Sequence, residues 1–450
     1  MAKKVADQLV DTLEKAGVRR IYAVTGDSLN EVNEAVRKNG RLRWIHVRHE
    51  ETGAYAAAAE AQLTGELACC AGSSGPGHVH LINGLYDAQR SGARVLAIAS
   101  TIPSREFGTE YFQETNTIKL FDDCSYYNQV ATTPEQFPRM LQGAMQAAIS
   151  SCGVGVIGLP GDLAAENATA GLSSTFSFPT RQRVCPAEQE IRELADLLNN
   201  AKKVTLYCGI GAKDAHPELV QLAKYEKVRE NLRSAAAVRG KEEKIQPEYV
   251  ISVVDELSSD DAIFTVDTGM TCVWGARYLQ ATGMRKMLGS FNHGSMANAM
   301  PQAIGAALAY PGRQVVALCG DGGISMLLGD LATIVQYHLP IKLIVFNNRS
   351  LGMVKLEMEV AGLPDWQTTM LNPDFARVAL SMGMAGYNVI NPDDVFPTLQ
   401  KVFNADGPAL VNIMTDPNAL AMPPKIEFSQ MLGFAQTIDR KSTRLKSSHV

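Results

Sequence analysis

The sequence predicts an α/β protein with two doubly wound parallel sheets and a truncated α/β segment between them. Short apolar runs of strand length alternate with helical stretches over residues 1–163, and the same alternation returns over residues 247–421. Between these units, residues 188–246 contain one strand-like run, KVTLYCG at 203–209. One strand and its flanking helices cannot bury both faces of a sheet, so this central segment is predicted to be the remnant of a domain.

The composition is that of an ordinary globular protein. The chain has 450 residues, enough for two or three domains, with 46% hydrophobic and 20% charged residues. A net charge of −5 provides no basic field, so no nucleic-acid partner is expected. No apolar run reaches the length of a membrane helix, no signal peptide precedes Val5, and the eight cysteines include no C-x-x-C pair. We therefore expect a cytoplasmic protein with reduced thiols.

The first unit opens with a predicted helix at 5–17, closed by glycine, and a strand at 20–24. Further strands are predicted from three apolar runs, LACCAG at 67–72, RVLAIAS at 94–100 and GVGVIGLP at 153–160. Residues 164–187 are small, polar and spaced by prolines, and are predicted to form a linker.

In the central segment, helices are predicted at 188–201 and 216–225, followed by a charged helical stretch without a further strand. The last unit begins with a predicted helix at 247–257 and a strand in AIFTVDTG at 262–269. Residues 422–450 are predicted to be a terminal arm, whose basic end RKSTRLKSSHV has no apolar face and is expected to be disordered.

A strand–helix–strand unit in the last domain carries the most informative motif. QVVALC at 314–319 and IKLIVF at 341–346 are predicted to be buried parallel strands, and the apolar spacing of 325–339 predicts the helix that connects them. The carboxyl ends of parallel strands meet at one edge of a sheet, where ligands bind. Asp321, in GDGG, and Asn348, in FNN, are therefore expected to lie side by side.

One anionic and one neutral oxygen on rigid strand ends suit a hard cation such as Mg²⁺. Ser350 is the third predicted metal ligand. Gly320, Gly322 and Gly323 allow backbone N–H groups to approach phosphate oxygens at a helix N-terminus, so a diphosphate can share the ion. A parallel strand can also end in Gly-Asp by chance, but the asparagine pair one crossover away favours the metal–diphosphate site.

This spacing resembles that of enzymes dependent on thiamine diphosphate (ThDP). Within that class the chain resembles pyruvate oxidase, the FAD-linked enzyme also called pyruvate dehydrogenase (quinone). The resemblance is carried by RHEETGAYAAAAEAQLTGELACCAGSSGPGHVHLINGLYDA at 48–88, YFQET at 111–115, LGSFNHGSMANAMPQAIGAAL at 288–308 and the GDGG…FNN unit. It implies that residues 1–163 bind the pyrimidine of ThDP and residues 247–421 bind its diphosphate with Mg²⁺. Such proteins pair the first domain of one subunit with the third domain of another, so a homodimer is the minimum and a tetramer is expected.

The resemblance also assigns roles to single residues. Glu50 is implied to be the carboxylate that contacts the pyrimidine, although an acid in a first helical turn is otherwise simply a partner of the helix dipole. Met296 is implied to hold the cofactor in a bent conformation, although a lone Met is otherwise core filler. The resemblance further places His80, Asp27 and Ser28 on the substrate side, and Asp27 and Ser28 are also counted as cofactor-binding. It places Phe112 and Gln113 near the reacting carbon, Glu357 in the active site as a further acid, and Thr268 beside the cofactor. His78 is left unassigned.

The activity implied by the resemblance is oxidative decarboxylation of pyruvate. The products are CO₂ with either acetate, when a quinone is the acceptor, or acetyl phosphate, when oxygen and phosphate are used. Met353 and Thr268 depart from residues common in relatives and can change the size of the pocket. A change of about one methylene discriminates substrates only about 10–200-fold, so pyruvate remains the expected substrate. The alternatives are an acetolactate-synthase-like carboligase and a non-catalytic remnant.

The central segment is the largest departure from the family. In relatives this region is a complete FAD-holding domain, for which about 100–150 residues are usual. Here YCGIGAKDA at 207–215 matches only its beginning, and GIGA can equally be a packed strand–helix turn. We therefore expect FAD to bind poorly or not at all, with a deletion that is either natural or a splice in the assembled sequence. The match fades after GFAQ at 433–436 without an amphipathic helix, so membrane association triggered by lipid is not expected.

Overall fold

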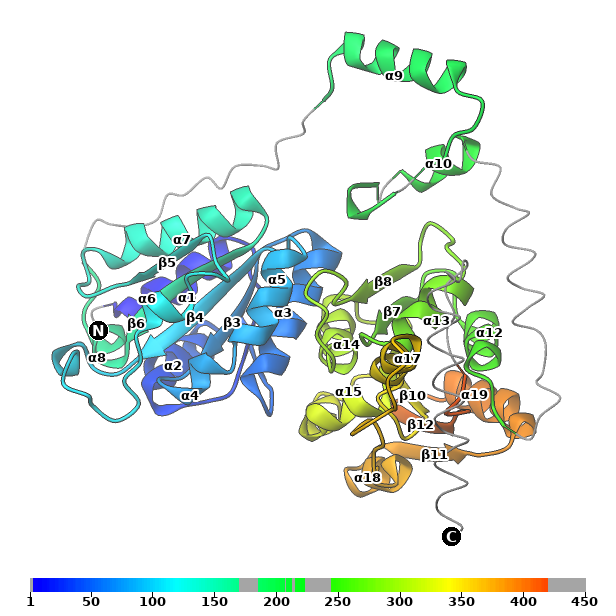
Figure 1. Cartoon of the computed structure of the whole chain (residues 1–450). Helices are drawn as coiled ribbons and strands as arrows, with labels where there is room; N and C mark the ends of the chain where they lie inside the picture. The colour runs from blue at the N-terminus through cyan, green and yellow to red at the C-terminus, as the bar shows by residue number, and fades with distance from the viewer. Residues whose placement is uncertain (1–2, 170–184, 207, 213–214, 223–243, 420–450) are drawn as a thin grey trace.

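The computed structural model describes residues 3–169, 185–206, 208–212, 215–222 and 244–419. It contains two six-stranded sheets with the strand orders β2-β1-β3-β4-β6-β5 and β11-β12-β10-β9-β7-β8 (Figure 1). Every paired neighbour in both sheets is parallel. The prediction of an α/β fold with two parallel sheets is therefore confirmed.

The first sheet and its helices occupy the N-terminal unit. The strands are β1 (Arg20–Ala23), β2 (Arg43–His46), β3 (Ala68–Gly72), β4 (Val95–Thr101), β5 (Tyr127–Val130) and β6 (Val154–Pro160). The helices are α1 (Val5–Lys15), α2 (Asn30–Asn39), α3 (Glu50–Thr64), α4 (Pro76–Val79), α5 (Ile82–Arg90), α6 (Thr117–Leu120), α7 (Phe137–Ser151) and α8 (Gly161–Ala165), with 3-10 turns η1 (Asp27–Leu29) and η2 (Ser104–Glu106). The four predicted strands are the four inner strands, and every residue in them is buried.

The second sheet and its helices occupy the C-terminal unit. The strands are β7 (Ile263–Val266), β8 (Lys286–Gly289), β9 (Val315–Gly320), β10 (Lys342–Asn347), β11 (Ala385–Val389) and β12 (Ala409–Met414). The helices are α12 (Pro247–Leu257), α13 (Met270–Tyr278), α14 (Ala299–Ala309), α15 (Asp321–Met326), α16 (Leu331–Gln336), α17 (Gly352–Val360), α18 (Phe375–Ser381) and α19 (Val395–Asn404), with 3-10 turns η4 (Leu328–Asp330) and η5 (Pro392–Asp394).

The crossover from β9 to β10 corrects one prediction. The apolar spacing of 325–339 predicted a single helix, but the chain forms α15, η4 and α16 in succession. The break places Asp330, 1% exposed, against the N-terminal unit. Its carboxylate accepts the Arg48 N–H at 2.8 Å and the Thr52 hydroxyl at 2.7 Å. A contact between the two units therefore overrides the helical periodicity of this segment.

One cluster of buried hydrophobic side chains spans the two units, and each unit also has a cluster of its own. Helix α3, rich in alanine and almost wholly buried, packs against α14, and residues of both helices belong to the same cluster of buried side chains (Figure 1). The helices approach closely because their contact surfaces are small: a methyl group added at Gly305 would collide with the carbonyl of Ala56. This packing fixes the start of α3, where Glu50 lies, relative to the second sheet.

The central segment contains α9 (Glu188–Asn200), η3 (Ile210–Ala212) and α10 (His216–Leu222). The strand predicted at 203–209 is wrong for its described residues, and Val204 and Leu206 are exposed. A single strand has no partner for its backbone groups and no cover for its faces, so it is not stable alone. Helix α9 buries no residue and stands apart from both sheets (Figure 1).

Three predicted features lie outside the described residues: most of the 164–187 linker, the charged stretch that follows α10, and the arm at 422–450.

Within the part of the chain that the structure describes, no helix combines the length and the apolar character needed to cross a bilayer.

Candidate active site

A partly open cavity of about 80 Å³ lies at the carboxyl edge of the second sheet. Strand β9 ends at Gly320, and α15 begins at the next residue, Asp321, while β10 ends at Asn347. Eight residues predicted for the site line this one cavity: Thr268, Met296, Gly320, Asp321, Gly322, Gly323, Asn348 and Ser350. The structure therefore brings together side chains that the sequence separates by as many as 82 positions, Thr268 to Ser350.

The Asp321 carboxylate is 3% exposed and accepts three hydrogen bonds. Oδ1 accepts the Gly322 N–H at 3.0 Å, and Oδ2 accepts the Arg349 N–H at 2.8 Å and the Asn372 side-chain amide at 2.7 Å. Burial raises the pKa of Asp321 above its ordinary value, and these bonds oppose the rise. The amide oxygen of Asn348 accepts the Ser350 N–H at 2.9 Å.

The turn that follows β10 holds these groups in place through an unusual backbone conformation. Arg349 has φ 55, a left-handed conformation that a residue with a side chain adopts only at some cost. Its N–H points at Asp321, and its neighbours Asn348 and Ser350 both line the cavity. The strained residue therefore lies between two of the predicted metal ligands, Asn348 and Ser350.

Close packing restricts the last two glycines of GDGG, whereas a methyl group at Gly320 would meet open space. A methyl group at Gly323 would collide with the Asp267 carboxylate, and one at Gly322 would lie 3.0 Å from Met296 Cε. Asp267, which sequence reasoning missed, is 1% exposed and accepts the N–H groups of Ala299 at 2.9 Å and Gly320 at 3.1 Å. Burial raises the pKa of Asp267 to about 7, although these N–H groups lower it. Asp267 therefore joins α14 to the start of the glycine-rich turn.

A chain of amide groups leads away from the cavity. Asn372, also missed, donates to both Asp321 Oδ2 and Asn347 Oδ1, at 2.7 and 2.9 Å. In the same direction, the amide nitrogen of Asn347 donates to Asn412 at 3.0 Å and that of Asn412 donates to Asn388 at 2.8 Å. The amide nitrogen of Asn388 then donates to the Asp374 carboxylate at 2.8 Å. This asparagine chain crosses β10, β12 and β11 and anchors Asp321 to the sheet.

The carboxyl edge of the first sheet gathers a second group of predicted residues. Ser28 Oγ lies 3.0 Å from Ser73 Oγ and accepts the Ser74 N–H at 2.9 Å. Ser74 in turn donates to Gln113 Oε1 at 2.7 Å, and Asp27 Oδ1 accepts from Ser73 at 3.4 Å. Asp27, Ser28 and Gln113 are therefore neighbours, joined by two serines that the sequence did not single out.

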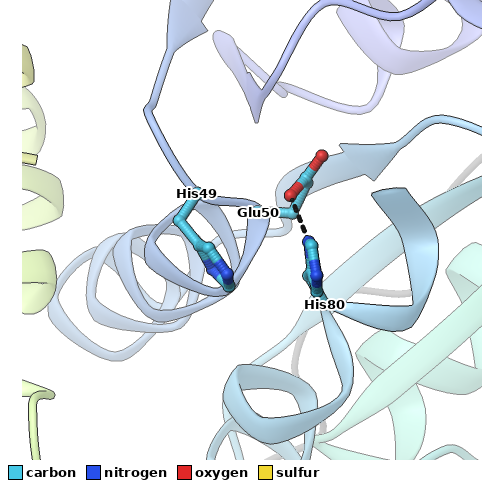
Figure 2. A group of neighbouring side chains, drawn as sticks. All are labelled: His49, Glu50 and His80. Carbon is cyan, nitrogen blue, oxygen red and sulfur yellow. Dashed lines mark hydrogen bonds and ion pairs between the residues drawn. The ribbon is translucent and has the colours of Figure 1, made fainter. Parts of the chain in front are cut away.

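Glu50 lies in the first turn of α3 and is 8% exposed (Figure 2). Its Oε2 is 2.9 Å from His80 Nδ1, and the His80 ring stacks on the ring of His49 with centroids 4.4 Å apart. His49 also caps α3, because its Nδ1 accepts the Glu51 N–H at 3.2 Å. Glu50 and His80, predicted separately from the sequence, are thus in direct contact.

Two predicted residues do not join either group. Phe112 is 76% exposed, and Glu357 is exposed on α17, outside the lining of the cavity. Their roles remain predictions. The unassigned His78 is buried, with Nδ1 2.8 Å from the Ser100 carbonyl and Nε2 2.5 Å from Thr115 Oγ1.

Within one chain, hydrogen bonds connect the residues around Glu50 to those around the cavity, but the two groups do not line a common pocket. Asn83 donates to Glu51 Oε1 at 2.8 Å and to Ser295 Oγ at 3.0 Å, so it connects the neighbour of Glu50 to the neighbour of Met296. All residues lining the 80 Å³ cavity nevertheless come from the C-terminal unit. Ligand pockets usually offer about 300–1,000 Å³, so this cavity is large enough for only part of a coenzyme.

Comparisons with known proteins agree with this division. Residues 3–120 match the family described as "Thiamine pyrophosphate enzyme, N-terminal TPP binding domain", and residues 267–413 match "Thiamine pyrophosphate enzyme, C-terminal TPP binding domain". Thiamine pyrophosphate is another name for ThDP. The "Putative thiamine pyrophosphate-containing protein YdaP" of Bacillus subtilis is 31% identical, with 97% of this chain and 96% of that protein aligned. The alignment runs over 550 positions although this chain has 450 residues, so at least 100 of the positions are gaps in this chain.

Other relatives carry more specific names. The pyruvate oxidase of Lactiplantibacillus plantarum is 28% identical, with 85% of this chain and 83% of that protein aligned. Acetolactate synthase 2 of Zea mays is 24% identical, with 94% of this chain and 87% of that protein aligned. An uncharacterized 42.6 kDa protein of Pseudomonas amyloderamosa is 52% identical, but the match spans 49% of this chain and 56% of that protein. With both coenzyme-binding domains matched and a relative aligned over nearly its whole length, this chain belongs to the family of thiamine-pyrophosphate-dependent enzymes.

Proposed function

We propose that this enzyme uses ThDP and Mg²⁺ to decarboxylate pyruvate, in a reaction of the pyruvate oxidase type. The observation that carries the proposal is the donor set of the 80 Å³ cavity, where the Asp321 carboxylate and the Asn348 amide oxygen lie at adjacent strand ends. One charged and one neutral oxygen fit Mg²⁺, which keeps several positions for water and phosphate oxygens. The residues present therefore fit the metal and the diphosphate end of the coenzyme.

The residues have distinct tasks in this proposal. Asp321, Asn348 and Ser350 would hold Mg²⁺ beside the diphosphate of the coenzyme, while Met296 forms the apolar wall of the cavity. When bound, the coenzyme supplies the nucleophilic carbon and the electron sink that decarboxylation of a 2-oxo acid requires. Glu50 would exchange a proton with the pyrimidine of the bound coenzyme. His80, whose Nδ1 lies 2.9 Å from Glu50 Oε2 and whose side chain is 45% exposed, would pass that proton to solvent.

The complete site is proposed to need a second copy of the chain. The cavity is small and takes all its lining residues from the C-terminal unit, while Glu50 and His80 belong to the N-terminal unit. A homodimer that places the N-terminal unit of one copy over the cavity of the other supplies both halves, and a tetramer of two such dimers is the larger assembly that we propose. The exposed Phe112 is then free to face the partner's cavity.

The oxidative half of the reaction is proposed to be impaired. The central segment lacks the strand predicted at 203–209 in its described residues and exposes Val204 and Leu206, which supports weak FAD binding or none. A carboligase like acetolactate synthase is the second candidate, because acetolactate synthases align with up to 94% of this chain. A quinone or oxygen is the acceptor only if the oxidative reaction persists.

The decisive experiment incubates the purified chain with ThDP, Mg²⁺ and pyruvate and measures CO₂, ferricyanide reduction, acetolactate and bound flavin. We expect CO₂ release that falls about 10²–10⁴-fold in Glu50→Gln, the range for general acid–base catalysis. Asp260→Asn, at an exposed acid in the C-terminal unit, is the matched control and should behave as the wild type.

The other readouts separate the candidates. Acetolactate as the main product favours the carboligase, and ferricyanide reduction with stoichiometric flavin contradicts the impaired oxidative half. A Glu357→Gln variant tests the exposed acid on α17, which should lose activity only if the assembled enzyme brings it to the substrate. Coenzyme binding without any CO₂ release would overturn the proposed function and leave a non-catalytic member of the family.

A further inference from the structure

A second cluster of metal-ligand side chains lies on the N-terminal unit, apart from the cavity that Asp321 lines. His49, Glu50 and His80 each offer one ligand atom, and these atoms all lie within 4.8 Å of one another (Figure 2). Among the described residues, this is the one group of three or more His, Cys, Asp or Glu side chains whose ligand atoms all lie this close together. It combines two imidazoles with one carboxylate.

The spacing of the atoms suits a common ion. Ligands at roughly 2.0–2.2 Å from a zinc ion are about 3.0–3.5 Å apart at the usual coordination angles. His80 Nδ1 and Glu50 Oε2 are already 2.9 Å apart, so an ion can replace the proton between them with little movement. The His49 ring stacks on the His80 ring with centroids 4.4 Å apart, so the His49 side chain must rotate to direct a ring nitrogen at the same ion and complete the set.

The environment allows an ion to enter and remain. The Glu50 side chain is 10% exposed, so its negative charge is largely removed from water, whereas the His80 side chain is 45% exposed and keeps a path to solvent. A cation would compensate the buried carboxylate, and a water would fill the fourth position.

The ligand types decide which ion is preferred. Two imidazole nitrogens and one carboxylate oxygen are a set that holds Zn²⁺ in proteins and suits Co²⁺. Mg²⁺ prefers oxygen ligands, which the Asp321 cavity offers. The two clusters therefore differ in the metal that they select.

Metal binding has one structural consequence in α3. His49 Nδ1 accepts the Glu51 N–H, so this nitrogen carries a lone pair. An ion at Nδ1 displaces that bond, and an ion at Nε2 requires the proton to move to Nδ1, which removes the acceptor. In either case, α3 loses the cap provided by His49, which is a long bond at 3.2 Å.

We propose that, without coenzyme, His49, Glu50 and His80 bind a transition-metal ion of the Zn²⁺ type. We propose further, resting on the function argued above, that this ion competes with ThDP because both require the Glu50 carboxylate. The site is then an inhibitory metal site: Mg²⁺ supports the enzyme through Asp321, and Zn²⁺ blocks it through Glu50.

The test titrates the coenzyme-free full chain with Co²⁺, followed by its visible absorption, in the presence of excess Mg²⁺ to fill oxygen sites. The chain has eight free cysteines, and binding to these is recognised by thiolate charge-transfer absorption. We expect one Co²⁺ per chain without that absorption, displaced by Zn²⁺. Loss of even an outer partner of a metal ligand lowers affinity about 10–100-fold, so His49→Gln should weaken Co²⁺ binding at least about 10-fold.

The matched control is His338→Asn, which removes an exposed histidine of the C-terminal unit and keeps a residue that tolerates its φ of 50. It should bind Co²⁺ as the wild type does, and circular dichroism should show all variants folded. Unchanged Co²⁺ affinity in both His49→Gln and His80→Gln overturns the site. Co²⁺ binding that ThDP and Mg²⁺ do not weaken overturns the competition alone. Failure of ThDP to bind in a buffer that contains Mg²⁺ but no transition metal counts against the proposed function. The Co²⁺ titration then still tests the metal site by itself.

Discussion

Replacing Asp330 with alanine tests how the two units are held together. Its carboxylate accepts the Thr52 hydroxyl at 2.7 Å, the Thr333 hydroxyl at 2.7 Å and the Arg48 N–H at 2.8 Å. Thr52 and Thr333 are both fully buried. Each hydroxyl left without a partner costs about 1–2 kcal/mol, and the Arg48 amide adds less because it is partly exposed. We expect Asp330→Ala to lower the free energy of unfolding by about 2–4 kcal/mol.

Urea unfolding followed by circular dichroism measures this loss as a lower midpoint at an unchanged slope. Asp330→Asn keeps one acceptor oxygen, and its amide can donate to Thr52, so its loss should be about 1 kcal/mol or less. Asp260→Ala, at an exposed position, should stay within about 0.5 kcal/mol of the wild type. Because Arg48 and Thr52 flank Glu50, Asp330→Ala should also weaken ThDP binding. A midpoint for Asp330→Ala equal to that of the Asp260 control refutes this account of the junction.

Three further predictions concern separate features. Burial raises the pKa of Asp87 from 3.8 to about 6, so the folded state holds the proton more tightly than the unfolded state. The free energy of unfolding should therefore fall by up to about 3 kcal/mol as the pH rises from about 4 to about 6. Thermal melts of Asp87→Asn over this pH range should lack that fall. Gly305→Ala should destabilise the chain by about 1–3 kcal/mol by pushing α14 from Ala56, whereas Gly211→Ala, with open space around it, should be nearly neutral; equal melting temperatures would contradict the close packing. Asn372→Ala removes a donor to Asp321 and should raise the Mg²⁺ dissociation constant about 10–100-fold in coenzyme-loading assays, and an unchanged constant would exclude this supporting role.

The sequence predicted the interior of each sheet better than its margins. The inner strands β1, β3, β4 and β6 are continuous apolar runs, because helices cover both of their faces. The edge strands β2, β5, β8 and β11 each include exposed or half-buried residues and give no such run. Their pairing depends on a neighbouring strand that is distant in sequence, so a local pattern does not reveal them. Strand β12 is a buried apolar run that periodicity alone could have found.

The site followed the same division between local and distant information. Asp321 and Asn348 could be expected at one edge of the sheet because parallel strands end at a common edge, and both line one cavity in the structure. Asn372 was missed because it belongs to a loop 51 residues from Asp321 and to no motif. Asp330 was taken as part of a helix because two of its partners, Arg48 and Thr52, lie in the other unit. The strand at 203–209 was predicted from its composition, but a strand also needs partners, and the central segment offers none in its described residues.

The hydrogen bonds of the asparagine chain at the edge of the second sheet all run in one direction. Each amide nitrogen along it points toward Asp374, and Asn372 at its head also gives a hydrogen to Asp321. Reversing one amide would set two donors or two acceptors against each other, so all must keep their orientation together. We therefore expect substitutions in this row to be tolerated better in sets than singly, and the orientation of the Asp321 carboxylate, the proposed Mg²⁺ ligand, depends on asparagines that do not line the cavity.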